Sequence, residues 1–127
     1  MRRIAKFQKV SRERYIGDYL DAFPGSDREQ AEAAYEALKL PERATGGSAG
    51  YDFFLPVDLT LKPGEGVRIP TGIRVSMEEG WVLKLYPRSG LGFKYRLQLD
   101  NTVGIIDSDY YFSDNEGHIQ AKLTNES

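Results

Sequence analysis

Residues 66–77 read Gly66-Val-Arg-Ile-Pro-Thr-Gly-Ile-Arg-Val-Ser-Met77. Apolar or β-branched side chains fall on every second position of this stretch, at Val67, Ile69, Thr71, Ile73, Val75 and Met77. A period of two is typical of a strand with one buried face. The glycine inside the run, Gly72, predicts a bulge or bend. The stretch therefore indicates a protein that is built mainly from β-strands.

The residues on both sides of this stretch, from Ala44 onward, also read as strands and turns. Strand-like segments are predicted at 51–57, 59–61, 81–85, 95–99 and 103–106. Turns rich in Gly, Pro or Glu separate some of them, at 62–66, 78–80 and 87–90. Short strands with turns at such spacing predict an all-β barrel or sandwich.

The first forty residues follow a different pattern. Residues 3–10 suit a short strand, and Ser11 is expected to cap a helix that carries Tyr15, Ile16, Tyr19 and Leu20. The run Ser26-Asp27-Arg28-Glu29 matches a capping box and predicts a second helix that Pro41 ends. The apolar stripe of that helix is Ala31, Ala34, Tyr35 and Leu38.

Charge and composition limit the classes of partner. The chain has 17 Lys and Arg against 19 Asp and Glu, a net charge of −2. This balance argues against sequence-independent binding of a nucleic-acid polymer. Binding of a single nucleotide is still possible, because it needs only a few cationic groups near the phosphates. No apolar run is long enough to cross a bilayer and no secretory signal opens the chain. With no cysteine, we expect a cytoplasmic protein without a membrane partner.

The same composition limits the chemistry. There is no cysteine and one histidine, His118. Cysteine nucleophiles and thiolate metal sites are excluded, and a Ser-His-Asp site is nearly so. Hydrolytic chemistry would therefore depend on carboxylates, hydroxyls, arginine and backbone groups, with or without a hard metal ion such as Mg²⁺.

Three segments carry side chains suited to such chemistry. The first, Ala49-Gly50-Tyr51-Asp52-Phe53-Phe54, holds one acidic residue before a predicted strand. The second, Pro87-Arg88-Ser89-Gly90-Leu91-Gly92, offers a guanidinium, a hydroxyl and backbone N–H groups that suit phosphate oxygens. Taken singly, the first segment is better explained as a surface acid and the second as an ordinary turn.

The third segment runs from Asn101 to Tyr111 and contains Asp107 directly after the apolar run 103–106. A carboxylate at the end of a buried strand can act as a general base on a water molecule. Because the ordinary pKa of Asp is about 3.9, partial burial must raise it or a fixed geometry must compensate. The alternative is that Asp107 only stabilises an Asx turn.

Taken in order, the three segments resemble the motifs of the homotrimeric dUTP diphosphatase (dUTPase) family. The resemblance covers about Leu40 to Tyr110 and includes the strand Ile69-Pro70-Thr71-Gly72-Ile73. It implies a mainly β fold, a distorted β-barrel of the jelly-roll type, in one domain spanning 1–127. Residues 44–111 would be the motif-bearing core, and 11–40 a helical insertion similar to one in some bacterial and phage-type members.

The resemblance implies hydrolysis of dUTP to dUMP and pyrophosphate. Asp107 resembles the base that activates the water attacking the α-phosphorus. The phosphate loop would be Arg88, Ser89 and Gly90. In this family Mg²⁺ travels on the triphosphate, and Asp52 resembles a carboxylate that holds a water of the ion rather than the ion itself.

The resemblance also implies how the nucleoside is selected. Asn101 and the backbone of Gly104, Ile105 and Ile106 resemble the hairpin that reads uracil. Tyr110 resembles the residue whose ring packs under the deoxyribose and leaves no room for a 2′-hydroxyl. The sites would lie at the subunit interfaces of a homotrimer that binds dUTP and dUMP.

Beyond Tyr111 we find no further family motif. The Gln-containing motif and the C-terminal Gly-Phe-Gly-Ser-Thr-Gly arm are not in the sequence, so we expect a chain without the C-terminal strand and lid, with a missing tail as the explanation. One alternative is a non-catalytic or truncated dUTPase-like module that binds a nucleotide or a protein. A relative of dCTP deaminase is a weaker one, because the segment Ile106-Asp107-Ser108-Asp109-Tyr110 speaks against it.

Overall fold

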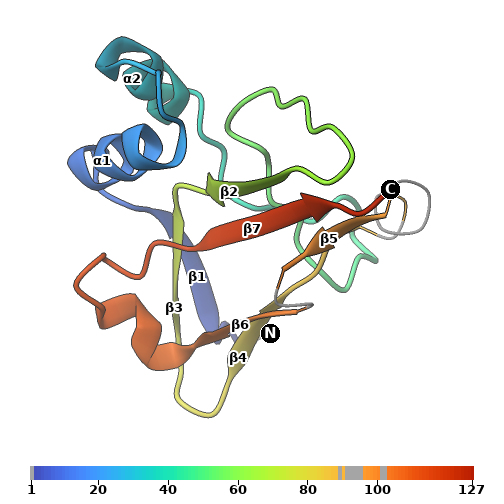
Figure 1. Ribbon diagram of the computed structural model, residues 1–127. Helices are drawn as coiled ribbons and strands as arrows, with labels where there is room; N and C mark the ends of the chain where they lie inside the picture. Colours follow the sequence, from blue (N-terminus) through green and yellow to red (C-terminus); the bar gives the residue numbers. More distant parts are fainter. Residues whose placement is uncertain (1, 89, 91–95, 101–102) are drawn as a thin grey trace.

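The structure is a computed structural model that describes residues 2–88, 90, 96–100 and 103–127 (Figure 1). Along the chain its elements are β1 (Ala5–Lys9), α1 (Arg12–Ala22), α2 (Arg28–Glu36), β2 (Gly66–Pro70), β3 (Ile73–Met77), β4 (Val82–Leu85), β5 (Leu97–Leu99), β6 (Gly104–Asp107), the 3₁₀ helix η1 (Ser108–Phe112) and β7 (Gln120–Asn125).

The strands pair antiparallel in three small sheets. β1 pairs with β3, β7 lies between β2 and β5, and β4 pairs with β6. The prediction of a mainly β fold is confirmed. Within the described residues these sheets do not close into one barrel, and the arrangement is that of a distorted jelly roll.

The stretch 66–77 forms two strands instead of one, because the chain bends at Thr71 and Gly72. Gly72 has a φ of +79°, which favours glycine, and a Cβ there would overlap the side chain of Leu38. The Thr71 hydroxyl donates to the Ile119 carbonyl at 2.6 Å. The predicted bend is therefore confirmed, and it sends β2 and β3 into different sheets.

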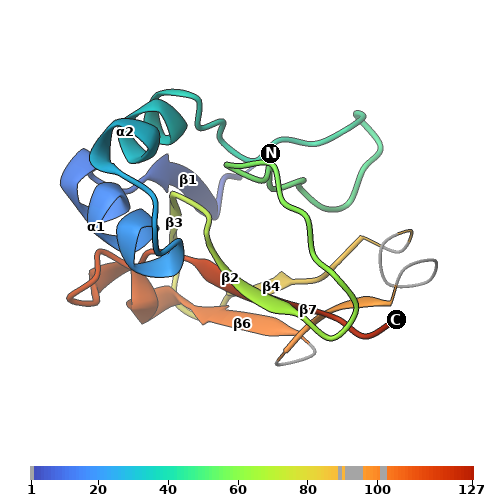
Figure 2. The same ribbon diagram turned by 45° about the horizontal axis from the view of Figure 1, so that its top comes forward.

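The two helices gather at one end of the molecule, as both ribbon views show (Figures 1 and 2). Ser11 caps α1 as predicted, its side chain accepting from the Arg14 N–H. The helices supply most of a buried cluster that contains Val10, Tyr15, Ile16, Tyr19, Ala31, Ala34 and Leu38. In the described part of the chain, no helix is long and apolar enough to cross a membrane.

The capping box of α2 lies one residue later than predicted. Asp27, rather than Ser26, accepts from the Gln30 N–H, and the Gln30 side chain accepts in return from the Asp27 N–H. The Ser26 hydroxyl instead donates to the Phe23 carbonyl at 2.5 Å. Ser26 therefore stabilises the turn after α1, which leaves the cap to Asp27.

The predicted strands at 51–57 and 59–61 are wrong. Over this part of the chain, the described pairing is a single bridge between Asp52 and Glu42. β-prone side chains form a strand only when a neighbouring strand and a face to pack on are available. Here Tyr51, Leu55 and Leu59 remain exposed, and Pro56 has no N–H to donate to a ladder.

Two further strands differ from the sequence analysis. β6 was expected to be buried, yet Ile105 keeps 52% of its surface exposed. β7 was not predicted at all, although Ile119, Ala121 and Leu123 alternate before and within it. β7 holds the middle position of its sheet, with β2 and β5 on its two edges.

Candidate functional site

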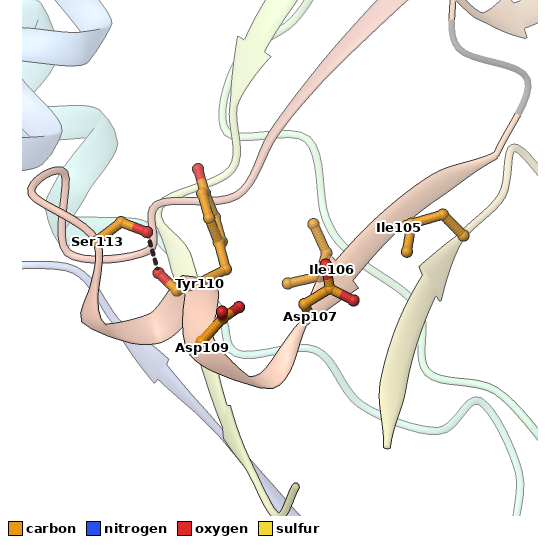
Figure 3. A pocket seen from close by; sticks show the side chains of 6 residues that line it. All are labelled: Ile105, Ile106, Asp107, Asp109, Tyr110 and Ser113. Atoms are coloured by element: carbon orange, nitrogen blue, oxygen red, sulfur yellow. Dashed lines mark hydrogen bonds between the residues drawn. The ribbon is translucent and has the colours of Figure 1, made fainter. Parts of the chain in front are cut away.

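A cavity of about 430 Å³ lies where β6 passes into η1 (Figure 3). Its lining residues are Ile105, Ile106, Asp107, Asp109, Tyr110 and Ser113. Four of the six are site residues named from the sequence. Asp109 and Ser113 were missed, and the adjacency of Asp109 to Asp107 and Tyr110 was the signal that could have found it.

Asp107 is the last residue of β6 and pairs with Val82 of β4. It precedes η1, but its side chain makes no capping hydrogen bond to that helix. The Asx-turn alternative therefore lacks the contact that defines it. The carboxylate is exposed, and Figure 3 shows it beside Asp109, facing the cavity.

Tyr110 forms the wall of the cavity opposite β6 (Figure 3). Its hydroxyl donates to the His118 carbonyl at 2.7 Å and accepts from the Asn115 side-chain amide at 3.0 Å. The Ser113 hydroxyl donates to the Tyr110 carbonyl at 2.6 Å. Both ends of the residue are thus held, which fixes the position of the ring.

The backbone of β6 has a strand partner on one edge only within the described residues, namely β4. In such a pair every second N–H and C=O group points to the other edge, where it can bind a ligand. Gly104 also has a packing reason to be glycine, because a Cβ there would lie 3.1 Å from the Leu85 Cβ. Asn101, the other part of the expected hairpin, lies outside the described residues.

Arg88 and Asp52, from the first two motifs, lie together. The Arg88 Nη1 is 3.4 Å from the Asp52 Oδ2, and the Arg88 side chain is 74% exposed. The backbone of Asp52 is fixed by its bridge to Glu42. Gly90 is exposed, with open space where a Cβ would stand, and Ser89 lies outside the described residues.

These two groups of residues lie at opposite ends of the β4–β6 pair. Asp107 pairs with Val82 at one end, and Gly104 pairs with Leu85 at the other. Arg88 follows Leu85 in the chain, at the end of β4 opposite Val82, which is the residue that pairs with Asp107. Within one chain, therefore, Asp107 lies near Tyr110 and Arg88 lies near Asp52, but these two pairs of residues are apart from each other.

A family model described as dUTPase matches residues 36–127. The match begins near the expected Leu40 and continues past Tyr110, through β7, where we had found no motif. The chain is also similar to the deoxyuridine 5'-triphosphate nucleotidohydrolase of Lactococcus lactis subsp. lactis, with 44% identity over 69% of this chain and 59% of the relative. For the one from Psychromonas ingrahamii, the identity is 51% over 56% of this chain and 49% of the relative. The chain thus spans about half the length of such relatives.

Solved structures of dUTPases are also similar to this chain. The crystal structure of dUTPase from Streptococcus mutans matches with a TM-score of 0.65 and 34% identity, over 95% of this chain and 79% of that one. The dUTPase from phage phi11 of S. aureus matches with a TM-score of 0.65 and 26% identity, over 98% of this chain and 61% of that one.

Proposed function

Because the chain belongs to the dUTPase family, we propose that it hydrolyses dUTP to dUMP and pyrophosphate. The observation that carries the proposal is the position of Asp107. Its carboxylate lies at the end of strand β6 and makes no capping hydrogen bond to η1. It lines a cavity that has Tyr110 on its other side. A carboxylate so placed can accept a proton from a bound water molecule.

The proposed reaction is an in-line displacement at the α-phosphorus. Asp107 takes a proton from the water molecule while the oxygen of that water bonds to the phosphorus. The bond from the α-phosphorus to the bridging oxygen breaks, and pyrophosphate leaves with that oxygen and the electron pair. Because β4 and η1 fix the backbone on both sides of Asp107, the Cα from which the carboxylate extends is held in one place.

Selection of the nucleoside would use the other walls of this cavity and the strand edge that continues from it. The open backbone edge of Gly104, Ile105 and Ile106 offers donors and acceptors for uracil, together with Asn101. The Tyr110 ring would pack against the deoxyribose, where an added 2′-hydroxyl would collide with it. The two hydrogen bonds on the Tyr110 hydroxyl support this role, because a ring can exclude an atom only if it cannot move away.

The triphosphate would bind at Arg88, Ser89 and Gly90. The chain has a net charge of −2, so cations for an anionic substrate must be local. Mg²⁺ usually keeps several waters and binds one or two carboxylates besides substrate phosphates, which fits the single carboxylate of Asp52 beside Arg88. Bound to the phosphates, the ion would neutralise their charge. A mutant dUTPase of phage phi11 is described with a structural Mg(II) ion.

The complete site would require more than one copy of the chain. Asp107 and Arg88 lie at opposite ends of β4–β6, so a triphosphate bound at Arg88 of one copy would meet Asp107 of another. The homotrimer expected from the family resemblance supplies such an interface, and cytoplasmic dUTP would be its substrate.

A second candidate is a module of the same fold that binds the nucleotide without hydrolysing it. It is favoured by the separation of Arg88 from Asp107, because the cavity beside Tyr110 could bind a nucleotide even where these two residues do not act together. The two candidates share the nucleotide cavity and differ only in turnover.

Product analysis with a panel of nucleotides tests the proposal. The chain is incubated with Mg²⁺ and dUTP, dCTP, dTTP or UTP, and the products are separated by ion-exchange chromatography. We expect dUMP and pyrophosphate from dUTP and much less product from the other three. Tight binding of dUMP without turnover would instead support the module. Equal turnover of dCTP or UTP would contradict the proposed selection.

A further inference from the structure

The segment Ser113–His118, which follows η1, wraps around Tyr110. Asn115 donates to the Tyr110 hydroxyl, and its own side-chain oxygen accepts from the Gly117 N–H at 3.0 Å. A Cβ on Gly117 would lie 2.7 Å from the Tyr110 carbonyl oxygen, so the segment approaches as closely as glycine permits. This segment therefore forms the outer support of the ring.

Part of the backbone of this segment has a conformation that costs free energy. Glu116 has a φ of 63° and Gly117 a φ of 70°, so two successive residues are left-handed. A left-handed conformation is costly for a residue with a side chain such as glutamate. Such a conformation persists only where contacts from elsewhere hold it in place.

Helix α1 supplies those contacts at its N-terminal end. The Ser11 N–H and hydroxyl donate to the two carboxylate oxygens of Glu116, at 2.8 and 2.6 Å. Arg14 donates to the Asp114 carbonyl at 3.3 Å. Although partial burial acts to raise it, these Ser11 hydrogen bonds hold the pKa of Glu116 below its usual value, so the carboxylate remains charged.

A second contact from α1 reaches the other end of the segment. The Asp18 carboxylate lies 2.6 Å from Nδ1 of His118, whose side chain is fully buried. The Gly72 N–H donates to Nε2 of His118 at 2.8 Å, so Nδ1 carries the proton and donates to Asp18. The backbone carbonyl of this same His118 accepts the Tyr110 hydroxyl.

We propose that helix α1 positions the Tyr110 ring in the cavity, with Asp18 acting through His118 and Asn115 acting directly on the hydroxyl. Asp18 and Asn115 are thus positioning residues for recognition of the sugar. This inference rests on the proposed function, in which the ring excludes a 2′-hydroxyl. It gives the N-terminal helical segment a role in substrate selection, in addition to its role in the core.

The experiment measures sugar discrimination, defined as the dissociation constant of UMP divided by that of dUMP. Both constants are determined by calorimetric titration. Asp18→Ala removes the contact to His118, and we expect the ratio to fall about fivefold, the size of one net hydrogen-bond contribution. Asp18→Asn can still accept from His118 and should keep most of the ratio.

Asp21→Ala is the matched control. Asp21 is also on α1 and pairs with Arg68 at 2.5 Å, away from the segment 113–118. We expect its ratio to equal that of the wild type. If Asp18→Ala weakens the binding of UMP and dUMP equally and leaves the ratio unchanged, the role of Asp18 is only structural and the inference is wrong.

Asn115→Asp provides a second variant in case Asp18→Ala does not fold. It keeps the oxygen that accepts from Gly117 but loses the N–H that donates to Tyr110. We expect a lower ratio in the wild-type background and no further effect in a Tyr110→Phe background. Equal effects in both backgrounds would contradict the inference. A wild-type chain that does not prefer dUMP would overturn the proposed function, and this inference with it.

Discussion

Asp107 has a fixed backbone, while its carboxylate makes no salt bridge within the described residues. The pairing of β6 with β4 fixes the backbone before it, and η1 begins directly after it. Its side chain makes no cap contact and faces the cavity. A residue placed in this way contributes little to folding, so its removal should affect chemistry more than stability.

We expect Asp107→Asn to lower kcat by about 10²–10⁴-fold, the usual contribution of a general base. Asparagine keeps the volume and can still hold a water molecule, so the affinity for a non-hydrolysable dUTP analogue should change little. Asp58→Asn, an exposed site outside the cavity, is the matched control and should retain wild-type kcat. A normal kcat in Asp107→Asn would eliminate this residue as the base.

His118 predicts how stability depends on pH. Burial lowers its pKa, and the hydrogen bond that His118 donates to the Asp18 carboxylate only partly opposes this. The unfolded chain, with an ordinary histidine pKa of about 6.5, therefore binds a proton before the folded chain does. The free energy of unfolding should decrease as the pH falls below about 6.5.

Thermal melting between pH 7.5 and 5.5 measures this effect. We expect the Tm of the wild type to fall with decreasing pH more steeply than that of His118→Gln, which can still accept from Gly72 but does not titrate. Parallel curves for the two proteins would mean that other groups cause the acid sensitivity.

At the scale of elements, the bend at Gly72 decides the arrangement of the strands. It separates β2 from β3, so that β2 joins β7 while β3 joins β1. Leu38, which follows α2, occupies the space beside Gly72. The helical segment and the β-core are therefore fitted to each other at this point.

We expect Gly72→Ala to lower the free energy of unfolding by about 2 kcal/mol or more, from the positive φ and the overlap with Leu38. Gly80→Ala is the control, since Gly80 has a φ of +89° but open space around it. It should cost about 1 kcal/mol from the backbone conformation alone. Chemical denaturation measures both, and equal losses would show that the contact with Leu38 is unimportant.

The elements differ in how well the sequence predicts them. The alternating run 66–77 and the capped α1 were predicted because local pattern and local structure agree there. The cap of α2 was misplaced by one residue, since Ser26 and Asp27 are both good capping residues and only the turn contact to Phe23 separates them. The prediction of a strand at 51–57 was wrong because the local sequence does not show whether a partner strand is available.

The same reasoning explains the site. Asp107 and Tyr110 could be named from the sequence because they share one segment with a specific motif. The contact from Asn115 to Tyr110 lies within a segment that has no regular pattern, and the contact between Asp18 and His118 joins residues a hundred positions apart along the chain. Such contacts depend on how the elements pack, which local patterns do not contain.

At the scale of the whole molecule, the separation of Asp107 from Arg88 has a direct consequence. If a second copy completes the site, two inactive variants can complement each other. Asp107→Asn subunits supply Arg88, and Arg88→Ala subunits supply Asp107. In a random equal mixture of a cyclic oligomer, roughly a quarter of the shared sites would contain both native residues.

Mixing the two variants, with partial unfolding and refolding to exchange subunits, measures this directly. We expect the mixture to recover about a quarter of wild-type turnover, although each variant alone has little. Light scattering on the same samples should report an oligomer. A mixture no more active than the mean of its two components would mean that each site lies within one subunit.

In the proposed reaction, a water molecule activated by Asp107 attacks the α-phosphorus of dUTP. Turnover in heavy-oxygen water, followed by mass spectrometry of both products, tests it most directly. We expect one heavy oxygen in the phosphate of dUMP and none in pyrophosphate, and we expect Asp107→Asn to form this product far more slowly. Heavy oxygen in pyrophosphate, or no labelled dUMP from the wild-type protein, would contradict it.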